Sequence, residues 1–106
     1  MRFPTKEYLN GKCAAFALAA HAISGWPIYV GKTVSKSGLG THVFVFDKKT
    51  GEAYDARGFY DPKDTDMIEY RPIDKKALLL INQLHLHIIN KKDVARASKK
   101  IEKDFE

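Results

Sequence analysis

Apolar residues recur at helical spacing in the early part of the chain. The segment from Lys12 to Ser24 contains neither Gly nor Pro, and its apolar and small residues fall on adjacent turns of a helix. Asn10 is well suited to cap the start of such a helix, and Gly25 is suited to the left-handed residue that ends one. Pro27 then prevents further helical turns. We therefore expect a helix over 12–24 and an extended segment after it.

Two extended segments around a glycine turn follow and predict β-structure. The segments 42–47, with its apolar run Val-Phe-Val-Phe, and 52–57 flank a short stretch that ends in Gly51, which can adopt a positive φ. These two segments predict an antiparallel hairpin. The Ser- and Gly-rich stretch 33–40 predicts a flexible loop that leads directly to His42. The sheet is expected to contain four strands, at about 28–31, 42–47, 52–57 and 67–71.

The C-terminal part of the chain returns to helical patterns. Asp74 is suited to cap a leucine-rich helix, and Asn90, with Asp93 three residues later, marks a further helix start. Between them, the segment 84–88 alternates with a period of two, so both a strand and a continued helix fit it. The order of elements predicts an α+β fold in which the helix carrying Cys13 packs on a small antiparallel sheet, with helices at the C-terminus.

Length and composition limit the class of protein. A chain of 106 residues fits a single domain over 1–106, and an apolar fraction of 44% is too high for a disordered chain. The longest apolar runs are far shorter than the roughly 20 residues that a membrane span needs. The first residues lack the apolar core of a secretory signal, so we expect a cytoplasmic protein with no membrane partner. The single cysteine excludes an internal disulfide.

Much of the positive charge lies near the end of the chain, whose formal net charge is +5. A basic amphipathic helix is predicted at about 91–104, because Val94, Ala97 and Ile101 recur on a face separate from the cations. These cations fit a solvated helix face, and they also fit a patch that binds an acidic protein or a nucleic acid. They are Lys91, Lys92, Arg96, Lys99, Lys100 and Lys103.

The only cysteine, Cys13, falls in the first turn of the predicted N-terminal helix. In that position, free backbone N–H groups and the positive end of the helix dipole favour the thiolate over the thiol. The alanines that follow it would let a neighbouring strand approach closely. A free cysteine is also among the most buried residue types, so Cys13 taken alone fits a structural role better than a catalytic one.

His42 and Asp55 offer the thiol two partners of suitable chemistry. His42 opens an apolar strand that would hold its backbone fixed, as a general base requires. In a hairpin that turns at 48–51, paired residue numbers sum to about 98 or 99, which places Asp55 roughly opposite Val43 and adjacent to His42. A carboxylate there would orient the imidazole and stabilise its protonated form. Asp55 also fits a strand-end carboxylate that pairs with Arg57.

These residues resemble the papain-like and transglutaminase-like superfamily of cysteine enzymes. The likeness covers Asn10 to about Gly58 and rests on Lys-Cys-Ala-Ala-Phe-Ala on a helix, Thr-His-Val-Phe-Val-Phe-Asp on a strand and Gly-Glu-Ala-Tyr-Asp-Ala-Arg-Gly on the next strand. The resemblance implies that Cys13 is the nucleophile, that His42 moves the proton and that Asp55 orients His42. It implies acyl transfer on a protein or peptide-like amide or an ester, by protease, deamidase, amidase or transglutaminase chemistry.

Papain-like proteases place an oxyanion-hole glutamine before the cysteine, and no glutamine precedes Cys13 here. Asn10, Tyr8 or the backbone N–H of Cys13 would have to serve in its place. No cofactor is expected, and no metal either, because the cysteine and histidines lack the spacing of a metal site. Two other functions stay open: a non-catalytic interaction protein of the same fold, which binds an acidic partner through its basic helix, and a nucleic-acid-binding module.

Overall fold

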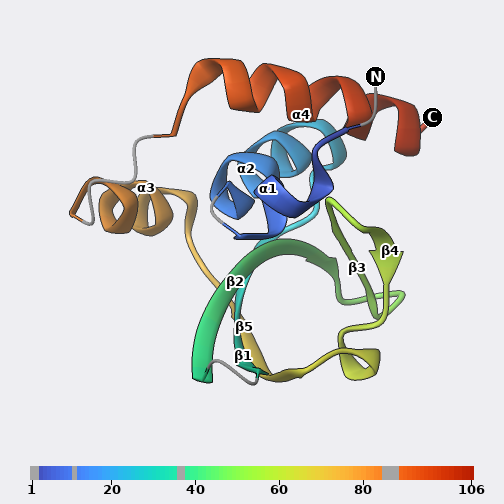
Figure 1. Ribbon diagram of the computed structural model, residues 1–106. Helices are drawn as coiled ribbons and strands as arrows, with labels where there is room; N and C mark the ends of the chain where they lie inside the picture. The colour runs from blue at the N-terminus through green and yellow to red at the C-terminus, as the bar shows by residue number, and fades with distance from the viewer. Residues whose placement is uncertain (1–2, 11, 36–37, 85–88) are drawn as a thin grey trace.

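The computed structural model describes residues 3–10, 12–35, 38–84 and 89–106 (Figure 1). Its helices are α1 (Thr5–Asn10), α2 (Cys13–Ser24), α3 (Lys75–Leu84) and α4 (Lys91–Asp104). Its strands are β1 (Ile28–Ser35), β2 (Gly38–Asp47), β3 (Glu52–Asp55), β4 (Gly58–Tyr60) and β5 (Met67–Pro72), with a short 3-10 helix at Pro62–Asp64. The expected α+β class is confirmed.

The strands form one antiparallel sheet in the order β4-β3-β2-β1-β5. In the ladder between β2 and β3, Val45 pairs with Tyr54, so paired residue numbers sum to 99, one of the two predicted values. Helices α1, α2 and α4 lie together on one side of the sheet, and β2 arches beneath them (Figure 1). β3 has four residues and β2 has ten, so β2 continues well beyond its ladder with β3.

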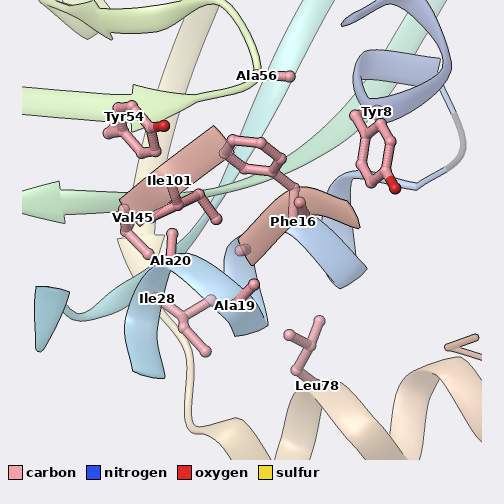
Figure 2. Close-up of a cluster of buried hydrophobic side chains, with 12 residues drawn as sticks. Tyr8, Phe16, Ala19, Ala20, Ile28, Val45, Tyr54, Ala56, Leu78 and Ile101 are labelled. Atoms are coloured by element: carbon pink, nitrogen blue, oxygen red, sulfur yellow. The ribbon is translucent and has the colours of Figure 1, made fainter. Parts of the chain in front are cut away.

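The helix-facing side of the sheet carries the larger hydrophobic cluster. Phe16 from α2, Tyr54 from β3 and Ile101 from α4 are each at most 1% exposed and meet in this cluster (Figure 2). The rings of Phe16 and Tyr54 pack with their centroids 5.5 Å apart. Ala97 and Ile101 are the buried residues of α4, which confirms the apolar face predicted for the basic helix. The cluster therefore joins both ends of the chain to the middle of the sheet.

The opposite side of the sheet carries a second, mainly aromatic cluster. Tyr29 lies opposite Phe44 in the β1–β2 ladder and packs against Phe46. The residues next to these aromatic residues in sequence point toward the helices, because successive side chains along a strand face opposite sides of the sheet. The sheet curls around this aromatic side (Figure 1). From His42 to Phe46, β2 is therefore packed on both sides, and its successive side chains belong to opposite sides of the sheet.

The start of α2 differs from the prediction, because Asn10 does not cap it. Asn10 ends the short helix α1, and Lys12 occupies the N-cap position of α2 without a side-chain cap hydrogen bond. The physical reason is Tyr8, whose complete burial among α1, α2 and α4 folds the preceding residues into a helix of their own. The other end of α2 is as predicted, since Gly25 adopts a left-handed conformation with φ 76°.

The predicted loop at 33–40 is wrong, because most of it is β-structure. β1 continues to Ser35 and β2 begins at Gly38, and these two residues pair. Thr33 pairs with Gly40, where an added Cβ would lie 3.1 Å from the Thr33 hydroxyl oxygen. Gly40 therefore permits close strand pairing rather than loop flexibility.

The second strand of the predicted hairpin is shorter than expected. β3 ends at Asp55 instead of residue 57, and a separate strand, β4, follows after Ala56 and Arg57. Gly58, with φ 102°, allows this tight return. The chain therefore reverses direction directly after Asp55, and β4 adds a fifth strand that the alternation of apolar residues did not predict.

The two C-terminal helices begin as predicted. A carboxylate oxygen of Asp74 accepts a hydrogen bond from the backbone N–H of Lys76 at 3.3 Å, and the amide oxygen of Asn90 accepts one from Lys92 at 2.8 Å. The ambiguous segment 84–88 lies outside the described residues, apart from the backbone of Leu84 at the end of α3. Among the residues that are described, no helix is both long and apolar enough to cross a membrane.

Substitution of Ile101 tests how α4 packs on the core. Ile101→Ala should lower the free energy of unfolding by about 2–5 kcal/mol, because it removes buried methyl groups and leaves a cavity. Lys99→Ala, on the exposed side of the same helix, is the matched control and should change it by less than about 0.5 kcal/mol. Urea unfolding followed by the fluorescence of Trp26 measures both. Equal losses in the two variants would contradict the described packing of α4.

Candidate active site

The β2–β3 hairpin brings His42 and Asp55 into contact. Nε2 of His42 lies 2.7 Å from Oδ2 of Asp55. The two side chains are only 9% and 2% exposed. The imidazole also stacks on Phe44, two residues along the same side of β2, with ring centroids 6.0 Å apart. The predicted neighbouring positions of His42 and Asp55 are therefore confirmed, and the contact is buried.

The carboxylate of Asp55 is held at the same time by Arg57. The backbone N–H and Nε of Arg57 donate to Oδ1 at 2.9 and 3.1 Å, and Nη2 donates to Oδ2 at 2.8 Å. Pairing with His42 and pairing with Arg57 were alternatives in the sequence, and the structure contains both. Because the chain reverses directly after Asp55, the Arg57 side chain returns over the carboxylate that precedes it.

Cys13 meets this pair from the start of α2. The ladder between β2 and β3 ends at the pair of Val45 and Tyr54, so it does not include Val43. The side chain of His42 and the backbone N–H of Val43 lie beside the sulfur, where both lower the pKa of the thiol. Nε2 of His42 is already engaged, so Nδ1 is the nitrogen left for the thiol. The sulfur of Cys13, the imidazole of His42 and the carboxylate of Asp55 thus follow one another as a row of three groups.

These groups shift one another's pKa toward charged forms. Burial raises the pKa of the Cys13 thiol, but hydrogen bonds from His42 and Val43 outweigh burial and lower it. Burial lowers the pKa of His42, but its hydrogen bonds to Asp55 and Cys13 raise it to about 9. Burial raises the pKa of Asp55, but hydrogen bonds from His42 and Arg57 hold it well below its usual range. The shifts therefore favour the thiolate of Cys13, the imidazolium of His42 and the carboxylate of Asp55 over their neutral forms.

The two side chains predicted for an oxyanion hole are not brought into this row. The hydroxyl of Tyr8 donates to the backbone oxygen of Asp93 at 2.7 Å, and the residue is fully buried. Tyr8 is therefore occupied elsewhere in the core. The side chain of Asn10 lies outside the described part of the structure. Phe16 donates a hydrogen bond to the backbone oxygen of Lys12 at the start of α2, and the N–H groups of this first turn are the oxyanion donors that the site offers.

The basic helix presents most of its predicted cations to solvent. Lys100 is the exception, because it is half-buried and donates to a carboxylate oxygen of Asp104 at 2.6 Å. The exposed members are Lys91, Lys92, Arg96, Lys99 and Lys103. The described residues contain no group of three or more His, Cys, Asp or Glu side chains that could hold a metal.

Tyr60 also contributes to the site, although the sequence did not single it out as a site residue. Its ring belongs to the aromatic cluster, and the guanidinium carbon of Arg57 lies 4.3 Å from the ring centroid. Burial and the negative charge of Asp55 raise the pKa of the Tyr60 hydroxyl. The useful signal would have been the strand 58–60, because Tyr60 pairs with Ala53, which lies on the same side of β3 as Asp55.

No protein family, curated protein or solved structure was found to match this chain. The resemblance to the papain-like and transglutaminase-like superfamily therefore stays a prediction. The function has to be argued from the arrangement of the site itself.

The titration of His42 tests the described electrostatics. His42 should titrate near pH 9 in the folded protein. Asp55→Asn should lower this pKa, because a neutral amide no longer stabilises the imidazolium. Imidazole nitrogen and carbon NMR shifts report the titration. His21, whose Nδ1 lies 2.8 Å from the carbonyl oxygen of Trp26, is the internal control, and its resonances should be the same in both proteins. An unchanged His42 titration in Asp55→Asn would contradict the contact.

Proposed function

We propose that this chain is a thiol-dependent acyl-transfer enzyme that acts on an amide or an ester. In this proposal Cys13 is the nucleophile, His42 is the acid and base, and Asp55 orients His42. The observation that carries it is the row of these three groups from α2, β2 and β3, in which Cys13 is half-buried, His42 and Asp55 are buried, and each group stabilises the charge of its neighbour. A cysteine with a packing role alone needs neither an imidazole nor a carboxylate behind it.

The first half of the reaction forms an acyl-enzyme. The thiolate of Cys13 attacks the carbonyl carbon, and the electron pair of the C=O bond moves to oxygen. The N–H groups of the first turn of α2 are oriented to stabilise this oxyanion, aided by the helix dipole. As the tetrahedral intermediate collapses, the imidazolium of His42 gives its proton to the leaving nitrogen or oxygen. The products of this half are a thioester on Cys13, a neutral imidazole and the free amine or alcohol.

The second half returns the enzyme to its starting state. Neutral His42 removes a proton from water or from an amine as that molecule attacks the thioester. Collapse of the second intermediate expels the Cys13 thiolate, which again faces an imidazolium. Attack by water gives hydrolysis or deamidation, and attack by an amine gives transfer. Asp55 stays ionised throughout and holds the ring in place.

Alkylation by iodoacetamide tests whether the row activates the sulfur. Because the pKa of Cys13 is lowered, the thiolate should persist as the pH falls below the ordinary thiol pKa of about 8.5. His42→Ala should shift the profile to higher pH and slow alkylation at about pH 6 by about tenfold or more. The denatured chain supplies the reference for an unactivated thiol. A folded protein that follows this reference would remove the main support for the proposal.

Acylation by p-nitrophenyl acetate tests the reaction itself. The protein should release a burst of about one equivalent of p-nitrophenol per chain, and mass spectrometry should find one acetyl group on Cys13. His42→Ala should slow acylation by about 10²- to 10⁴-fold. Cys13→Ser keeps the shape of the side chain and should abolish the burst. Acylation of the folded protein at the rate of free N-acetylcysteine would contradict a catalytic role.

The exposed side of α4 supports a second candidate function, the binding of an acidic protein or a nucleic acid. Five cations lie on this helix away from its buried residues, as expected for a surface that neutralises phosphates or carboxylates. A labelled DNA oligonucleotide is a suitable first probe. Affinity should fall steeply with salt and fall further in Lys92→Glu, while Cys13→Ala should leave it unchanged. Binding that is insensitive to salt would exclude this surface.

A further inference from the structure

Arg57 holds the carboxylate of Asp55, the third member of the row, in a more exact geometry than a surface ion pair requires. Three of its N–H groups donate to Asp55, and both carboxylate oxygens accept. The two partners differ in environment, because the side chain of Arg57 is 39% exposed and that of Asp55 only 2%. A bidentate guanidinium fixes the plane of a carboxylate as well as its charge.

The orientation of the Asp55 carboxylate plane matters because one of its oxygens, Oδ2, has two hydrogen-bond partners. Oδ2 of Asp55 accepts from Nη2 of Arg57 at 2.8 Å and faces Nε2 of His42 at 2.7 Å. Rotation of the carboxylate would therefore break the contact with His42. The ring of Tyr60 lies beneath the guanidinium and supports it through a cation–π contact.

The charges of the site balance only when Arg57 is counted. When Cys13 is ionised, it and Asp55 carry two negative charges, and His42 supplies one positive charge between them. Without the guanidinium, this buried row would carry a net negative charge, which favours protonation of one of its anions. The other titratable groups near Asp55 are the phenols of Tyr54 and Tyr60, and neither supplies a positive charge.

We infer that Arg57 is a positioning residue: by holding both oxygens of Asp55, it keeps the carboxylate aimed at His42 and keeps Cys13 in its nucleophilic form. This inference rests on the proposed function, since it assigns Arg57 a part in the same site. Arg57 acts through Asp55 and His42, and it does not contact the reacting sulfur itself.

The pH profile of Cys13 alkylation tests this inference, because a residue that only stabilises the turn would not move the profile. Arg57→Ala should shift the profile upward by about one pH unit and slow alkylation at about pH 7 by about tenfold. Arg57→Lys keeps the charge without the planar fork and should fall between the two proteins. Arg71→Ala removes the same side chain from exposed β5 and should leave the profile unchanged. Urea unfolding confirms that each variant is folded.

A double-mutant cycle shows whether Arg57 acts through Asp55. In the Asp55→Asn background, Arg57→Ala should produce no further shift of the profile. A shift of equal size in both backgrounds would overturn the inference, and so would an unshifted profile in Arg57→Ala. If the original protein already alkylates like its denatured chain, the proposed function fails first. If the original protein is activated and Arg57→Ala matches it, only the role of Arg57 is lost.

Discussion

The ionised carboxylate of Asp55 is the group on which the rest of the site depends. An isolated charge is costly to bury, so a carboxylate that is only 2% exposed needs charged partners with good hydrogen-bond geometry. The fold supplies one partner from each side, the imidazole of His42 and the guanidinium of Arg57. The end of β3, the turn after it and the register of β2 must therefore all be correct at once.

The register of the hairpin couples this requirement to the hydrophobic core. Val45 and Tyr54 pair and face the helices, while His42 and Phe44 lie on the aromatic side. A slip of one residue would turn every side chain of the strand to the other side of the sheet. It would bury His42 among aliphatic side chains and separate it from Asp55. The packing that stabilises the sheet thus also selects the arrangement of the row.

The sequence was sufficient to predict the helix bearing Cys13, the β2–β3 hairpin and the two C-terminal helices, because the residue pattern, the turn glycine and the caps that indicate them are local signals. It was insufficient where tertiary contacts decide. Asn10 is a good N-cap in isolation, but burial of Tyr8 places a separate helix before Cys13. Glycines in 33–40 look like loop residues, although Gly40 serves close pairing with Thr33.

In the site, too, local signals predict some residues, while tertiary contacts decide the role of another. Residue type and hairpin register were enough to predict Cys13, His42 and Asp55 as site residues, since both can be derived from local sequence. Arg57 could be recognised only as a competitor of His42 for Asp55. A carboxylate has two oxygens and can accept from both partners, and only the three-dimensional turn shows that it does.

The basic helix α4 has a structural role beside any role in binding. Asp93, near its start, accepts from Lys12 at 3.1 Å, and Lys12 directly precedes Cys13. Asp104, at its end, accepts from the hydroxyl of Tyr54 at 2.6 Å, and Tyr54 directly precedes Asp55. The ion pair of Lys12 and Asp93 is partly exposed and contributes little to stability alone. Together, however, the two contacts attach α4 to the residues that directly precede Cys13 and Asp55. The anions of α4 thus connect it to the site, while most of its cations face solvent.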